Sequence, residues 1–132
     1  MRDVAAWKQI PARKAQTAVL PTPITPALQH ALHQRGIDEL YTHQVKAITA
    51  VSQNKNAVIA TATSSGKSLC YTIPVMERLL ANPASRALYL FPTKALAQDQ
   101  LAEAMALIGA GNLLIAANSY DGDTPSSKRT KI

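Results

Sequence analysis

The sequence has a single cysteine, few acidic residues and no long apolar run. Cys70 stands alone among 132 residues, which excludes a disulfide within the chain and a metal site built from its own cysteines. No apolar run is long enough for a membrane-spanning helix, and no basic stretch followed by an apolar one opens the sequence. We therefore expect a cytoplasmic protein that does not associate with a membrane.

Acidic residues are outnumbered by basic ones. The chain has 14 Lys and Arg against 8 Asp and Glu, which gives a formal net charge of +6. This surplus favours a polyanionic partner such as nucleic acid, although a basic solvated face gives the same count. The length allows one small domain or a piece of a larger one, and the apolar fraction of 47% is ordinary for a globular chain.

Residues 58–68 carry the strongest motif. An apolar run is followed by a loop of small residues, and then Gly66, Lys67 and Ser68 open a predicted helix. This layout is typical of a phosphate-binding loop, in which backbone N–H groups bind phosphate oxygens, the lysine reaches the outer phosphates and the serine hydroxyl binds Mg²⁺. The common pattern has glycine where this chain has Thr61. A polar strand-to-helix turn with a serine cap is the alternative.

The spacing of apolar residues predicts an α/β fold. Short strands that are apolar throughout are expected of a parallel sheet covered on both faces, and their alternation with helices indicates such a sheet flanked by helices. The predicted helices are 25–36, 42–53, 67–82 and 94–108, and the predicted strands are 57–60, 87–91 and 113–117.

The chain is divided into two parts by its composition. Residues 1–24 contain three prolines and no sustained periodicity, which predicts an irregular segment. Residues 25–132 form the predicted domain, and it ends in a polar tail from residue 118.

Four stretches, in this order along the chain, resemble the motifs of one family. Residues 41–44 (Tyr-Thr-His-Gln) resemble the glutamine motif of superfamily 2 helicases of the DEAD/DEAH-box class, 61–68 resemble motif I, and 92–97 (Pro-Thr-Lys-Ala-Leu-Ala) resemble motif Ia. Residues 120–124 narrow the likeness to the Hrq-type DNA repair helicases, which are related to the RecQ-four type and to YprA-like proteins. In that subgroup threonine is also usual at the start of the phosphate loop.

The resemblance implies a truncated, RecA-like P-loop domain that binds ATP and Mg²⁺. It implies single-stranded or duplex DNA as the partner, with RNA as an alternative. Lys67 and Ser68 take the catalytic positions, and Ser68 meets Mg²⁺ through the nucleotide. Thr93 and Lys94 take the positions that contact the translocating strand. The implied ATP-binding residues are Gln44, Thr61, Ala62, Thr63, Ser64, Ser65, Gly66, Lys67 and Ser68.

The chemistry of the residues is compatible with these roles, but each also has a simpler interpretation. The Gln44 amide offers a donor and an acceptor, the pair that adenine N6 and N7 require, although a glutamine facing solvent on a helix is the alternative. Thr93 and Lys94 open a helix, where a hydroxyl, backbone N–H groups and an ammonium can meet a phosphate. The alternative is an ordinary cap with a solvated lysine.

The remaining polar residues of interest have structural interpretations. His30, His33 and His43 lack a third ligand at useful spacing, so we interpret them as surface histidines rather than a metal site. Asp121 and Asp123 flank a glycine and most simply make a turn.

Two features of the helicase family are absent from the 132 residues. These enzymes need an acidic motif that holds Mg²⁺ and positions the attacking water, and a second RecA-like domain that carries an arginine finger. The resemblance therefore implies the first part of the first domain, which needs further C-terminal sequence and is inactive alone. Two other functions stay open, namely a P-loop ATPase that does not act on nucleic acid and a non-catalytic binding fragment.

Overall fold

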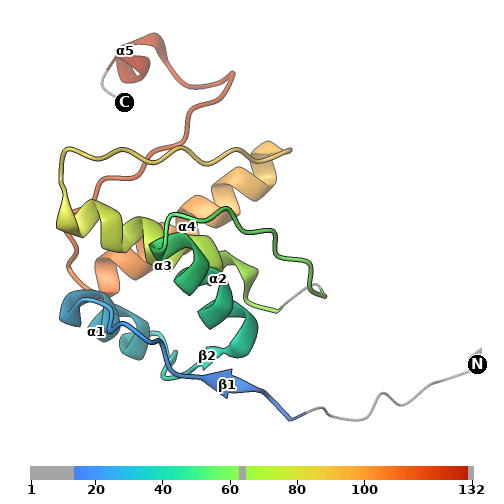
Figure 1. The fold of residues 1–132 in the computed structure, drawn as a ribbon. Helices are drawn as coiled ribbons and strands as arrows, with labels where there is room; N and C mark the ends of the chain where they lie inside the picture. The colour runs from blue at the N-terminus through green and yellow to red at the C-terminus, as the bar shows by residue number, and fades with distance from the viewer. Residues whose placement is uncertain (1–13, 63–64, 131–132) are drawn as a thin grey trace, which may run out of the picture.

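A computed structural model describes residues 14–62 and 65–130 of the chain. All four helices predicted from the sequence are confirmed, with ends that differ by a few residues, and a short fifth helix follows them (Figure 1). The elements in chain order are β1 (Thr17–Ala18), α1 (Pro26–Gln34), β2 (Leu40–Tyr41), α2 (Thr42–Ser52), α3 (Lys67–Ala81), α4 (Lys94–Ala110) and α5 (Ser126–Arg129).

The helix starts follow from local chemistry. Pro26 occupies the first turn of α1, where its missing N–H has no helical partner to lose. The preceding Thr25 is anchored on α3, because its N–H and its hydroxyl donate to Glu77 Oε1 at 2.9 and 2.8 Å. This pair of hydrogen bonds fixes where the chain enters α1.

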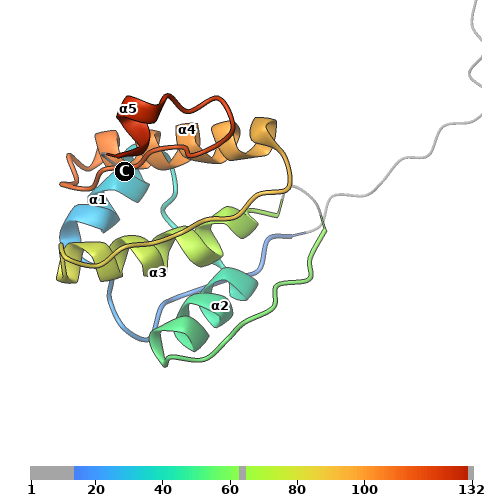
Figure 2. The same cartoon turned by 90° about the horizontal axis from the view of Figure 1, so that it is seen from above.

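The core lies between α1, α2, α3 and α4. α1, α2 and α3 each turn an apolar stripe toward the others, as expected of amphipathic helices that bury one face, whereas α4 buries only Leu107 and Ile108 near its C-terminal end. In Figure 2 α3 runs between α2 on one side and α1 with α4 on the other. The buried apolar cluster comprises Leu28, Ala31, Leu32, Leu40, Val45, Ile48, Ile73, Met76, Leu107, Ile108 and Leu113.

A two-stranded antiparallel ladder precedes α2. Thr17 lies opposite Tyr41 and Ala18 opposite Leu40, and the Thr42 N–H donates to the Gln16 carbonyl oxygen at 2.9 Å. The interpretation of residues 1–24 as irregular is therefore wrong for β1. A two-residue strand is too short to show a periodic pattern in the sequence, so β1 is recognised only by its pairing with β2.

The three predicted strands do not form in this structure. Residues 57–60, 87–91 and 113–117 run as extended chain without strand pairing to any described residue (Figure 1). Several of their apolar side chains are open to solvent: Val58 is 97% exposed and Leu114 is 99% exposed, whereas Leu113 is buried in the core. These segments have the apolar composition of strands, but a strand also needs a neighbouring strand to pair with its backbone N–H and C=O groups. The described residues provide no such neighbour here, so the predicted parallel sheet is not observed.

Two extended segments lead to the starts of α3 and α4. Residues 57–62 run toward the start of α3, and residues 87–93 run toward the start of α4. Figures 1 and 2 both place the two helix starts on the same side of the molecule. The segments that carry motifs I and Ia in the sequence therefore end close to the same face.

No helix in the described ranges 14–62 and 65–130 is long and apolar enough to span a membrane.

Candidate nucleotide-binding site

The turn into α3 requires glycine. Gly66 has a φ of +71°, in the left-handed region that other residues adopt at a cost. A Cβ atom at this position would lie 2.6 Å from Gln44 Nε2, which is closer than two such atoms can approach. Gly66 therefore lets α2 approach the loop. Lys67 and Ser68 follow it in the first turn of α3, as a phosphate-binding loop requires.

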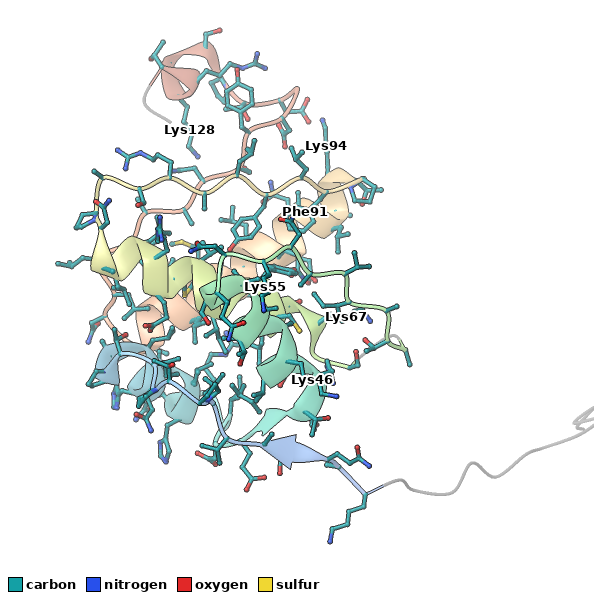
Figure 3. The ribbon with its side chains drawn as sticks, in the orientation of Figure 1. Lys46, Lys55, Lys67, Phe91, Lys94 and Lys128 are labelled. Carbon is teal, nitrogen blue, oxygen red and sulfur yellow. The ribbon has the colours of Figure 1, made fainter. Side chains whose placement is uncertain are left out.

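The Lys67 side chain folds back over the loop. Its Nζ donates to the Ala62 carbonyl oxygen at 2.5 Å and to the Thr61 carbonyl oxygen at 3.3 Å. Thr61 and Ser65 lie together as well, with 2.6 Å between their hydroxyl oxygens. The structure thus brings these predicted ATP-binding residues around one ammonium group, which is labelled in Figure 3. Two further predicted residues, Thr63 and Ser64, lie outside the described residues.

Gln44 is buried against the loop. Its side chain is 2% exposed, so the alternative of a glutamine facing solvent is wrong. Its Oε1 accepts from the Tyr41 N–H at 2.8 Å, and its Nε2 donates to the Gly66 carbonyl oxygen at 2.8 Å. The amide keeps one hydrogen and one lone pair for a further partner. Contact with adenine stays a prediction.

His43 also contacts the loop, which the sequence did not lead us to expect. Its Nε2 lies 2.9 Å from the Ser65 carbonyl oxygen. A carbonyl only accepts, so Nε2 carries the hydrogen. The half-buried ring stacks on Tyr41, with 5.8 Å between ring centroids and 16° between ring planes. Interpretation as a surface histidine is therefore wrong for His43. Its place beside Gln44 in the first turn of a helix was the signal available in the sequence.

The start of α4 is exposed and capped locally. The Leu96 N–H donates to Thr93 Oγ1 at 3.2 Å, as in an ordinary N-cap. Lys94, labelled in Figure 3, is not simply solvated, because its ammonium pairs with the Asp123 carboxylate. This hydrogen bond raises the pKa of Lys94. The predicted strand-binding residues thus lie at a helix start, with one acidic partner beside the lysine.

Residues 121–124 form the predicted turn. The Asp123 N–H donates to Asp121 Oδ1 at 2.9 Å, and the Asp121 N–H donates to Thr124 Oγ1 at 2.9 Å. The hydrogen bond from the Asp123 N–H lowers the pKa of Asp121. Arg129 on α5 fastens the turn by donating to the Thr124 carbonyl oxygen at 2.7 Å and to the Asp121 carbonyl oxygen at 3.1 Å. The turn thereby places the Asp123 carboxylate beside Lys94.

Residues that could bind a metal directly are sparse. Within the part of the chain that the structure describes, no group of three His, Cys, Asp or Glu side chains is placed to hold one. Ser68, in the first turn of α3, is the hydroxyl that the motif assigns to Mg²⁺, and a single neutral hydroxyl binds the ion only together with nucleotide oxygens.

Comparison with known proteins agrees with this geometry. The family model of the DEAD/DEAH box helicases matches residues 41–132, which span the glutamine motif, the phosphate loop and the start of α4. The chain belongs to the DEAD/DEAH-box helicase family. The matched region begins at Tyr41, where β2 leads into α2.

The similar proteins in this family are much longer than the chain. It is 45% identical to the ATP-dependent helicase YprA of Bacillus subtilis (strain 168), over 98% of the chain and 17% of that protein. It is 39% identical to the ATP-dependent helicase hrq1 of Schizosaccharomyces pombe, over 92% of the chain and 12% of that protein. The predicted resemblance to YprA-like and Hrq-type helicases is confirmed.

A solved helicase structure shares the fold. The crystal structure of the DUF1998 helicase MrfA bound to DNA and AMPPNP superimposes with a TM-score of 0.89, at 44% sequence identity, and the match covers 99% of this chain and 18% of that one. The chain therefore has the fold of this part of a RecA-like helicase domain. The chain spans less than a fifth of the length of each of these relatives.

Proposed function

We propose that this chain is the ATP-binding part of an ATP-dependent DNA helicase. The observation that carries the proposal is the phosphate loop at the start of α3, where the buried Gln44 donates to the Gly66 carbonyl oxygen and the Lys67 ammonium lies against the Thr61 and Ala62 carbonyl oxygens. Similar proteins are named ATP-dependent helicases, and MrfA was solved bound to DNA and AMPPNP. The names of these longer proteins support a helicase function for a protein that contains this chain.

Each loop residue has a defined task in this proposal. Lys67 binds the outer phosphates, and the backbone N–H groups at the start of α3 bind phosphate oxygens with the favourable end of the helix dipole. Ser68 holds Mg²⁺ together with the nucleotide, and the bound ion offsets phosphate charge. Gln44 uses its remaining hydrogen and lone pair for adenine. The fit rests on the loop geometry, since glycine, lysine and serine succeed one another where the helix begins.

The start of α4 is assigned to the nucleic acid. Thr93 and Lys94 are exposed at the start of α4, and this helix start lies on the same side of the molecule as the start of α3 (Figures 1 and 2). A hydroxyl, an ammonium and a helix start can together bind a phosphate of the DNA backbone without reading its sequence. Single-stranded DNA is the expected ligand, and RNA is the alternative.

The exposed apolar segments belong to a parallel sheet in this proposal. Residues 57–60, 87–91 and 113–117 expose side chains such as Val58, Leu88 and Leu114. Exposed apolar runs of this length favour association, and further strands of the same domain would cover them. Slow hydrogen exchange at these backbone amides in a longer form of the protein would support the sheet, and rapid exchange there would contradict it.

Two binding measurements on the chain test the proposed function. A fluorescent ATP analogue is titrated with Mg²⁺, and a labelled oligonucleotide of single-stranded DNA is titrated at low salt by fluorescence anisotropy. We expect both ligands to bind, with nucleotide binding weakened in Lys67→Ala and DNA binding weakened in Lys94→Ala. Nucleotide binding without DNA binding would favour a P-loop ATPase that does not act on nucleic acid. DNA binding without nucleotide binding would favour a non-catalytic binding fragment.

A further inference from the structure

Two neighbouring side chains at the start of α2 hold two successive carbonyls of the phosphate loop. His43 Nε2 donates to the Ser65 carbonyl oxygen at 2.9 Å, and Gln44 Nε2 donates to the Gly66 carbonyl oxygen at 2.8 Å. Gln44 is among the residues predicted to bind ATP, whereas no sequence motif assigned a role to His43. The loop is thus attached to α2 at two adjacent peptide groups.

The attachment determines where the loop N–H groups point. A trans peptide is planar, and its C=O and N–H groups point in opposite directions. No described peptide bond is cis. A Ser65 carbonyl directed at His43 therefore turns the Gly66 N–H away from α2. In the same way, the contact from Gln44 turns the Lys67 N–H away from α2. These two amides belong to the loop that the motif assigns to phosphate.

The helix that carries His43 is anchored in the core. Val45 and Ile48, one and two turns into the start of α2, are buried in the core. Tyr41 stacks on the imidazole ring from the residue before α2. The donor therefore stands on a helix that is anchored by buried contacts, and its ring is stacked on the partly exposed Tyr41, which is the kind of support that a positioning residue requires.

We propose that His43 is a positioning residue for phosphate binding. Its Nε2–H fixes the Ser65–Gly66 peptide in the orientation that presents the Gly66 N–H to a nucleotide phosphate. The imidazole itself does not touch the nucleotide. This inference rests on the proposed function of the loop, and it predicts an effect on phosphate binding that is independent of the base.

Three substitutions at one position separate the hydrogen bond from the ring. His43→Phe keeps an aromatic ring for Tyr41 but removes the donor. His43→Gln returns an N–H near the position of Nε2, whereas His43→Asn carries its amide closer to the backbone. The matched control is His30→Phe, which makes the same change at an exposed position of α1.

The readout is the affinity of the whole chain for ATP, GTP and inorganic triphosphate with Mg²⁺, measured by calorimetry. His43→Phe should weaken all three about three- to tenfold, the range for losing one hydrogen bond. His43→Gln and His30→Phe should bind like the parent. A loss confined to ATP would assign His43 to the base and overturn the proposal, as would unchanged binding by His43→Phe.

Two further comparisons cover a variant that does not fold and a failure of the phosphate loop itself. If thermal melting shows that His43→Phe does not fold, the comparison passes to His43→Gln and His43→Asn. Equal triphosphate affinities for these two variants would overturn the proposal, and weaker binding by His43→Asn would support it. Lys67→Ala is measured in the same series. If Lys67→Ala binds like the parent, the proposed phosphate loop itself fails, which is a different result from a failure confined to His43.

Discussion

The starts of α3 and α4 have similar local sequences, but different contacts stabilise them. Each follows an extended apolar segment, each has a lysine as its first helical residue, and both lie on one side of the molecule. At α3 the N-cap is Gly66, which has no side chain, and the loop is held by the buried Gln44 of α2. At α4 the N-cap is Thr93, which caps the helix itself.

The difference shows which of the two ends depends on tertiary structure. The contact from Gln44 to Gly66 joins residues 22 positions apart, and one partner is fully buried. The Thr93 cap joins residues three positions apart and needs nothing else in the fold. The loop at α3 is therefore held by a neighbouring helix, whereas the cap at the start of α4 is purely local.

The largest difference between the two helix starts is expected in ATP affinity when the lysine of each is replaced. Lys67→Ala should weaken ATP binding by about 1.5–3 kcal/mol, because it removes a charge-assisted contact to the outer phosphates. Lys94→Ala should leave ATP binding unchanged. Calorimetry with ATP and Mg²⁺ measures both. Equal losses in the two variants would show that the two ends do not have separate ligands.

The next effect concerns the backbone at Gly66. Gly66→Ala should destabilise the chain by about 1–3 kcal/mol, since alanine must adopt a left-handed conformation. The new Cβ would also clash with the Gln44 amide.

Gly109→Ala is the matched control for Gly66→Ala. It lies inside α4 with no atom within 4 Å of the new Cβ, so it should raise stability by about 0.5–1 kcal/mol. Chemical denaturation monitored by circular dichroism gives both values. A Gly66→Ala variant as stable as the parent would mean that α2 does not constrain the loop.

A smaller effect is expected on DNA. Lys94→Ala should weaken binding of single-stranded DNA a few-fold at low salt. The slope of log affinity against log salt should fall by about 0.7, the value for one phosphate contact on a single strand. Anisotropy titrations over a salt series measure the slope. An unchanged slope would remove Lys94 from the interface.

The smallest effect is expected from the acidic partner of Lys94. Asp123→Asn removes the carboxylate that competes with phosphate for the ammonium, so DNA affinity should rise by about twofold, as is typical for an exposed ion pair. The double variant Lys94→Ala with Asp123→Asn serves as the control. If Asp123→Asn increases affinity equally when Lys94 is absent, the carboxylate acts through general charge and not through this pair.

Much of the local structure was predictable from the sequence, whereas the contacts around the loop were not. Periodicity and helix starts predicted α1 to α4, and the order of motifs predicted the helicase family. The partner of His43, Ser65, lies 22 positions away, so its place beside Gln44 at the start of a helix is the one hint of this contact in the sequence, and the contact itself depends on how α2 packs. Lys94 was expected to meet solvent or DNA, and its acidic neighbour lies 29 positions away.

The sequence by itself determined the helices, the glycine at the turn into α3 and the lysines that follow the two turns, because these depend on side-chain periodicity and local backbone geometry. Only the tertiary structure decided which side chains contact the start of α3 and the start of α4. The packing of α2 on α3 brings His43 and Gln44 to the loop carbonyls, and the turn at 121–124 brings Asp123 to Lys94. It also decided that residues 57–60, 87–91 and 113–117 have no strand partner within the described ranges 14–62 and 65–130, because a strand is defined by hydrogen bonds to a neighbour and not by its own composition.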